Sequence, residues 1–252
     1  MSVGAISLLS LSNGAKEPRV NAAKKSPIVD RDFVERFMWA VDRPMAYGVY
    51  YLFHDWWAEA PQGAIDSYME QLHSIPGAQT FLQERHIPEP IDVERLASCA
   101  PGTLGKGYYD FVVENELLDK FAVNYRAFND KLQQSGKLDR LPADMSFMMV
   151  RGTQIHDFQH VLTGFDSSPY GELSLAAFYL AQLRFPYHAM RMAVTFGHAA
   201  FVNPDITVDA MDAIVKGWSL GRQSDNLNFA HWEAELDTPI SELRERYSIH
   251  TA

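Results

Sequence analysis

Residues 141–185 read LPADMSFMMVRGTQIHDFQHVLTGFDSSPYGELSLAAFYLAQLRF, and this stretch decides the predicted fold. Apolar residues recur three and four positions apart on both sides of a short turn, which is the spacing of amphipathic helices. Asp144 lies near the start of the first helix, and Gly164 is a natural stop at its end. Pro186 ends the second helix. The stretch therefore predicts an antiparallel pair of helices joined by the turn GFDSSPYG.

Helical spacing continues outward from residue 32, and apolar residues that alternate with a period of two are hard to find. No internal repeat or linker follows residue 30. We therefore predict an all-α fold, with a single compact multi-helix domain at residues 31–252. Residues 1–30 are rich in Ser and Ala, mildly basic and without a sustained period. They are predicted to be either a disordered tail or a targeting peptide.

Composition excludes several classes of protein. The net charge of −10 and the pI near 5.3 argue against a nucleic-acid partner. The single cysteine, Cys99, excludes an internal disulfide framework and a zinc site built from cysteines. No window of about 18 apolar residues is free of charges, so no segment is expected to span a bilayer.

Four residues at the junction of the helix pair suggest a metal site. His156 and His160 lie one helical turn apart and share a face, Asp157 borders that face, and Glu172 opens the next helix. Two imidazoles and two carboxylates suit zinc, iron(II) or manganese better than calcium or copper(I). If Asp157 orients a histidine instead of binding the ion, a coordination position opens for substrate or water. The alternative interpretation is structural, with histidines that bond backbone carbonyls and a glutamate that favours the helix N-terminus.

Three ordered motifs give the sequence a family resemblance. The segment HDFQHVLTGFDSSPYGE, residues 156–172, resembles the His-Asp-x-x-His-x11-Glu motif of the ubiquinone (coenzyme Q) biosynthesis protein 4 family. The segment PGTLGKGYYDFV at residues 101–112 and the C-terminal segment at residues 217–249 resemble two more of its motifs. The resemblance covers roughly residues 100–249, is loose over residues 32–99 and does not extend to residues 1–30.

The resemblance implies an all-helical, membrane-peripheral protein of quinone biosynthesis. It implies a zinc-type site at His156, Asp157, His160 and Glu172, which would be both metal ligands and catalytic residues. The implied reaction is a lyase (decarboxylase) reaction, which removes the C1 carboxylate of a polyprenyl 4-hydroxybenzoate-type precursor, with hydroxylation at that carbon. The resemblance also implies a role as organiser of the biosynthetic complex. The alternative is a non-catalytic scaffold that binds prenyl lipid and carries a structural metal. A metal-dependent hydrolase is disfavoured, because Asp157 occupies the position of the Glu in the peptidase motif His-Glu-x-x-His.

The resemblance also implies partners and a location. The expected partners are a polyprenylated aromatic substrate or prenyl lipid, other quinone-biosynthesis enzymes, a membrane surface and a second copy in a homodimer. The expected location is the cytoplasmic face of the inner membrane in a bacterium, or the matrix face of the inner mitochondrial membrane in a eukaryote.

Several further residues are secondary candidates. Three arginines, Arg151, Arg184 and Arg191, are candidates to hold a carboxylate, although each is more simply a surface or helix-end charge. A second histidine-acid pair at residues 54 and 55, with the Glu-x-x-His spacing at residues 70–73, is too little for a two-metal bundle. Three isolated histidines, His188, His198 and His231, are interpreted as structural.

Overall fold

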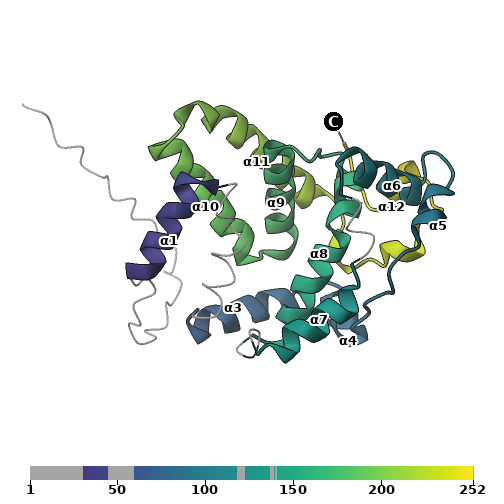
Figure 1. The fold of residues 1–252 in the computed structure, drawn as a ribbon, viewed down its shortest axis with the longest axis horizontal. Coiled ribbons are helices and arrows are strands. Elements are labelled where there is room, and N and C mark those ends of the chain that lie inside the picture. Colours follow the sequence, from purple (N-terminus) through teal and green to yellow (C-terminus); the bar gives the residue numbers. More distant parts are fainter. Residues whose placement is uncertain (1–30, 45–59, 118–122, 137–138, 140, 252) are drawn as a thin grey trace, which may run out of the picture.

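The computed structural model describes residues 31–44, 60–117, 123–136, 139 and 141–251, and every regular element in these residues is helical (Figure 1). This confirms the predicted all-α fold class. The predicted tail at residues 1–30 and the histidine-acid pair at residues 54 and 55 lie outside the described residues. In the described part of the chain, no helix has the length and hydropathy that a bilayer span requires.

The elements follow one another along the chain as α-helices of five residues or more, with three-residue 3-10 helices between some of them. They are α1 (Arg31–Asp42), α3 (Gln62–His73), α4 (Ala78–Glu84), α5 (Val93–Ala97), α6 (Leu104–Glu114), α7 (Tyr125–Gln134), α8 (Ala143–Thr163), α9 (Pro169–Leu183), α10 (Pro186–Phe201), η3 (Pro204–Ile206), α11 (Thr207–Gln223), η4 (Leu227–Phe229), η5 (Trp232–Ala234) and α12 (Ile240–Arg246).

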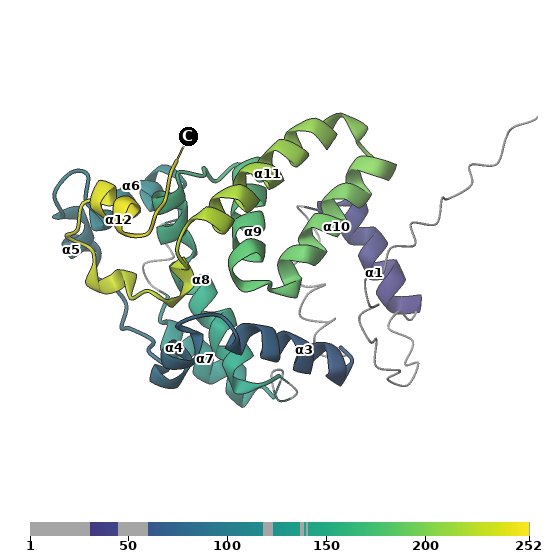
Figure 2. The same ribbon diagram turned by 180° about the vertical axis from the view of Figure 1, so that it is seen from behind.

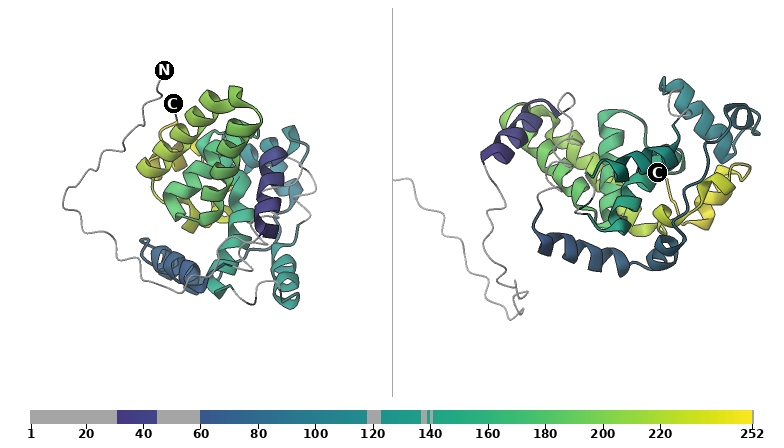
Figure 3. Two further views of the ribbon diagram at one scale, coloured as in Figure 1. Left: turned by 90° about the vertical axis from the view of Figure 1, so that its left-hand side faces the viewer. Right: turned by 60° about the horizontal axis from the view of Figure 1, so that its bottom comes forward.

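Helix α8 runs through the middle of the molecule (Figure 1). Helices α6, α7 and α12 contact it directly, and α9 to α11 form a neighbouring layer to which α1 is added through α10. Figure 2 shows the same arrangement from behind, with α11 across α9, and the left view of Figure 3 shows α1 beside α10. Because α8 is surrounded, most of its side chains are buried whatever their direction.

A buried ion pair fixes α8 to the C-terminal segment. The guanidinium of Arg151 is completely buried and donates two hydrogen bonds to the Glu233 carboxylate, at 2.6 and 2.9 Å. It also donates to Gln154 Oε1 and to the carbonyl of Ala230. This set of partners offsets the cost of burying the charge, which is several kcal/mol for an unpaired ion.

Helices α9 and α11 approach each other with backbone against backbone. A Cβ atom at Gly217 would lie 1.9 Å from the carbonyl oxygen of Ser174, and one at Gly221 would lie 2.7 Å from that of Phe178. Only glycine fits at such distances, since real Cβ contacts are essentially never shorter than 3.0 Å. The position of α9 is therefore set by two glycines of α11.

Candidate metal centre

The turn between α8 and α9 positions the candidate ligands. Gly164 takes a left-handed conformation (φ 74°) and its N–H donates to the carbonyl of His160, so α8 ends there as the sequence predicts. Ser168 then caps α9 by accepting a hydrogen bond from the N–H of Gly171, and Pro169 is the first helical residue. The chain thus reverses within residues 164–168, and Glu172 comes into the first turn of α9.

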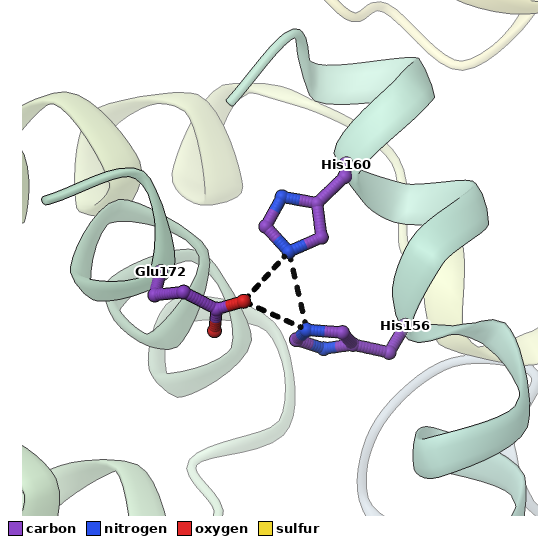
Figure 4. Close-up of side chains that lie close together, drawn as sticks. All are labelled: His156, His160 and Glu172. Atoms are coloured by element: carbon purple, nitrogen blue, oxygen red, sulfur yellow. Dashed lines mark hydrogen bonds and ion pairs between the residues drawn. The ribbon is translucent and has the colours of Figure 1, made fainter. Parts of the chain in front are cut away.

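His156, His160 and Glu172 point toward one another across this turn (Figure 4). The Nε2 atoms of the two histidines are 3.1 Å apart. Oε1 of Glu172 lies 3.2 Å from His160 Nε2 and 3.3 Å from His156 Nε2. The three potential ligand atoms therefore form a nearly equilateral triangle.

The size of this triangle suits a divalent ion. If an ion lay about 2.1 Å from each atom, atoms about 3.2 Å apart would subtend about 100° at it, between octahedral and tetrahedral angles. The donor set fits as well. The Phe165 carbonyl can only accept, so His160 Nδ1, 2.9 Å away, donates to it and Nε2 is left with a lone pair facing the other two atoms. A cation that lies out of the plane of the triangle, at equal distances from the three atoms, satisfies this arrangement, and the carbonyl orients the imidazole.

The electrostatics of the site favour an ionised Glu172. Burial alone would raise the pKa of this carboxyl, but the adjacent imidazoles of His156 and His160 and the charge of Arg191 together hold it well below its ordinary range. The guanidinium of Arg191 lies 3.5 Å from Oε2, the oxygen that does not face the histidines. Oε1 is therefore free to act as a ligand while Oε2 is held by a cation.

Asp157 does not join the three residues. It is buried, but no oxygen of its carboxylate belongs to the group of ligand atoms. Burial raises the pKa of Tyr108 and Tyr125, and the charge of Asp157 adds to both shifts. The structure therefore brings together three of the four residues expected from the sequence.

The candidate centre opens into a cavity of about 250 Å³. His156 and Glu172 lie in its wall, with side chains 26% and 27% exposed, whereas the His160 side chain is 1% exposed. Apolar side chains of α3, α8 and α9, among them Met148 and Leu183, line much of the remainder, and residues of α10 complete the wall. One side of the candidate centre is thus closed by protein and the other faces a mainly apolar space.

The secondary candidates differ in where they lie. Arg191 reaches the cavity, whereas Arg151 is occupied by Glu233. Arg184 is exposed at the end of α9, in a left-handed conformation. His73, from the Glu-x-x-His spacing that is too little for a second metal site, bonds Asp144 at 2.7 Å.

The three isolated histidines do not behave alike. His198 Nδ1 donates to the Val41 carbonyl, and His231 Nε2 pairs with Glu84, so both have structural partners. His188 was expected to be structural too, but it lines the cavity. Burial lowers its pKa well below the ordinary value, helped by the charges of Arg191 and His156, so the imidazole is neutral at pH 7. No local sequence pattern pointed to His188, because this residue comes from a separate helix.

Together these features describe an all-helical protein with a His-His-Glu cluster at the wall of an apolar cavity. The family model described as coenzyme Q (ubiquinone) biosynthesis protein Coq4 matches residues 59–252. The chain therefore belongs to this family of ubiquinone biosynthesis proteins. The match begins about forty residues before the segment in which the sequence motifs are clear.

Individual relatives agree with this assignment. The chain is 31% identical over 183 residues to the mitochondrial ubiquinone biosynthesis protein coq4 of Sclerotinia sclerotiorum, covering 71% of this chain and 59% of that protein. It is 26% identical over 161 residues to that of Pyrenophora tritici-repentis, covering 63% and 50%. The chain thus spans between half and three fifths of the length of these two relatives.

A solved structure shares the fold. It is a protein of Nostoc punctiforme, provisionally described as a ubiquinone biosynthesis protein, with a TM-score of 0.65 and 24% sequence identity. The superposition covers 87% of this chain and 95% of the other. At this identity the likeness supports the arrangement of the helices.

Proposed function

We propose that this protein catalyses the metal-dependent C1 decarboxylation, with hydroxylation, of a polyprenyl 4-hydroxybenzoate-type precursor of ubiquinone. The observation that carries the proposal is the His-His-Glu cluster in the wall of an apolar cavity of about 250 Å³. A cavity of about 150 Å³ holds benzene, so a substituted aromatic ring fits here while a long prenyl tail must extend through the opening.

His156, His160 and Glu172 would hold the ion, which we propose to be zinc, with iron(II) and manganese as the alternatives that suit this donor set. When bound, such an ion would withdraw negative charge from the ring substituent that it contacts. Asp157 takes no direct ligand role in this proposal. Arg191 provides a second positive charge on the cavity wall, where it would orient the substrate carboxylate.

The overall chemistry requires an oxidant. The bond between C1 and the carboxylate carbon breaks, carbon dioxide leaves, and C1 gains a hydroxyl group whose oxygen comes from one water molecule, with release of a proton. The substrate thereby gives up two electrons, so a two-electron acceptor such as dioxygen must take part. The apolar cavity wall keeps bulk water from the ring during this exchange.

The cluster is open to the cavity on one side, where His156 and Glu172 are partly exposed. This opening favours a catalytic metal over the alternative of a non-catalytic scaffold with a structural metal. Structural zinc sites are closed by four protein ligands, whereas catalytic sites keep a position open. Here three side chains supply the ligand atoms, and two of them line the cavity.

For the homodimer we propose the outer face of α11. Val208, Met211, Val215 and Trp218 are exposed at spacings of three and four residues, which is the pattern of a helix–helix seam. The stripe is symmetric about residue 213, so a second copy in antiparallel orientation places Val208 against Trp218 and Met211 against Val215. Val215→Asp should convert a dimer into a monomer in light scattering, and an unchanged mass would exclude this interface.

The remaining partners and the location follow the family. We propose peripheral membrane attachment and association with other quinone-biosynthesis enzymes. The matched relatives named above are described as mitochondrial, which supports the matrix face of the inner mitochondrial membrane in a eukaryotic host. The cytoplasmic face of the inner membrane is the equivalent expectation for a bacterium.

Elemental analysis and a turnover assay on the same samples test the proposal. The wild-type protein should carry about one metal ion per chain and release carbon dioxide from a geranylated 4-hydroxybenzoate when a two-electron oxidant is present. Glu172→Gln should lose most of the metal and the turnover. Glu84→Gln is the matched control, because this glutamate pairs with His231 on the surface.

The outcomes separate the alternatives. Full metal content and turnover in Glu172→Gln would exclude the proposed site. A wild-type protein that binds metal and prenyl lipid but releases no carbon dioxide would favour the scaffold.

A further inference from the structure

Two buried polar atoms line the cavity without a hydrogen-bond partner among the described residues. They are Oη of Tyr179 and Nδ1 of His188. The Tyr179 residue is 5% exposed and His188 is 9% exposed. A buried polar group without a partner costs about 1–3 kcal/mol, and nearly all such groups in folded proteins are paired. Two unpaired groups in one cavity therefore indicate a place where a bound molecule supplies hydrogen bonds.

The rings that carry these atoms are stacked. Tyr179 and His188 have ring centroids 4.9 Å apart and planes 6° apart. His156 is also parallel to Tyr179, with ring centroids 6.2 Å apart and planes 7° apart. The position of both polar atoms is thus fixed by ring packing.

Helices α9 and α10 each contribute one residue to each of two polar pairs in the cavity wall, and Tyr179 with His188 is the second pair. The first pair is Glu172 with Arg191, beside the candidate metal centre. The second pair, Tyr179 with His188, lies seven residues farther along α9 and three residues earlier along α10. The pairs are therefore separated by about 10.5 Å along the axis of α9 and by about 4.5 Å along the axis of α10. One pair is charged and the other is neutral.

A para-hydroxybenzoate has the matching polarity, with an anionic group at one end of a flat ring and an uncharged hydroxyl at the other. A phenolic hydroxyl donates one hydrogen bond and accepts others, and a tyrosine hydroxyl and a neutral imidazole together offer both roles. We propose that Tyr179 and His188 bind the phenolic hydroxyl of the substrate, with its carboxylate toward Arg191 and the metal centre. This inference rests on the proposed function for the nature of the substrate.

Binding measurements with two probes test the inference without relying on turnover. The probes are 3-geranyl-4-hydroxybenzoate and 3-geranylbenzoate, which differ only in the hydroxyl, and calorimetry gives their dissociation constants for the protein as purified. We expect the wild type to prefer the hydroxylated probe by about threefold to tenfold, the range of one neutral hydrogen bond. Tyr179→Phe and His188→Phe, which keep an aromatic ring, should each reduce this preference and leave binding of the other probe unchanged.

Tyr108→Phe is the matched control, since Tyr108 is buried outside this cavity. It should keep the preference of the wild type. The inference is overturned if the wild type binds both probes equally, or if Tyr179→Phe weakens both by the same factor. A protein that prefers the hydroxylated probe but releases no carbon dioxide would refute the proposed reaction and leave this subsite in place.

Discussion

Replacing Gly217 with alanine should disturb the candidate metal centre from a distance. The added Cβ would lie 1.9 Å from the Ser174 carbonyl oxygen, and ordinary contact begins at 3.4 Å. Helices α9 and α11 must therefore separate locally by about 1.5 Å, and overpacking of this kind costs about 1–3 kcal/mol. Glu172 lies two residues before Ser174 on α9, so its carboxylate moves with the helix. Metal sites tolerate changes of only about 0.2 Å in ligand distance.

Chemical denaturation and zinc titration measure the two consequences. We expect Gly217→Ala to lower the free energy of unfolding by about 2 kcal/mol and to weaken zinc binding at least tenfold. The control is Gly63→Ala on α3, where an added Cβ has no atom within 4 Å and the higher helix propensity stabilises by up to about 1 kcal/mol. If both variants matched in stability and zinc affinity, the close approach of α9 and α11 would not position the ligand.

Three further predictions concern separate parts of the molecule. Arg151→Met leaves the Glu233 carboxylate buried without its cation and should cost about 3–5 kcal/mol in urea denaturation; a loss below about 1 kcal/mol would contradict the pairing. Zinc at about 100 times its dissociation constant should stabilise the protein by about 2.7 kcal/mol, and a chelator should reverse this, whereas Glu172→Gln should respond to neither. His188 has a folded pKa below its ordinary value of 6.5, so the unfolded chain binds the proton first as the pH falls. As the pH is lowered from about 6.5, the free energy of unfolding of the wild type should therefore decrease relative to that of His188→Phe, by up to about 1.4 kcal/mol per pH unit. Parallel pH profiles of the two proteins would contradict this.

The helical hairpin that carries the candidate ligands was predictable because its signals are local. Gly164 ends α8 and Pro169 begins α9 in the structure, and both are residues whose backbone preferences act without tertiary context. His156 and His160 share a face for the same reason. The helical repeat alone brings residues four apart to the same side.

Asp157 shows where this reasoning was too permissive. It neighbours His156 in sequence, but successive residues of a helix point about 100° apart, and its carboxylate lies outside the group of ligand atoms. The contributions of α10 could not be predicted at all. Arg191 was one of three equal arginine candidates, and His188 looked like a core histidine, because neither has a local pattern that reports which helix will pack against it.

The site and the cavity differ in the length of chain that each requires. The three ligand atoms belong to one hairpin, with 11 residues between His160 and Glu172, whereas the cavity also needs Tyr68 from α3 and Arg191 from α10. Closing a short loop costs less entropy than joining distant segments, and local contacts form faster during folding. An ion captured by the hairpin would therefore bind before the pocket exists, and the metal content of a misfolded variant would not report whether its cavity has formed.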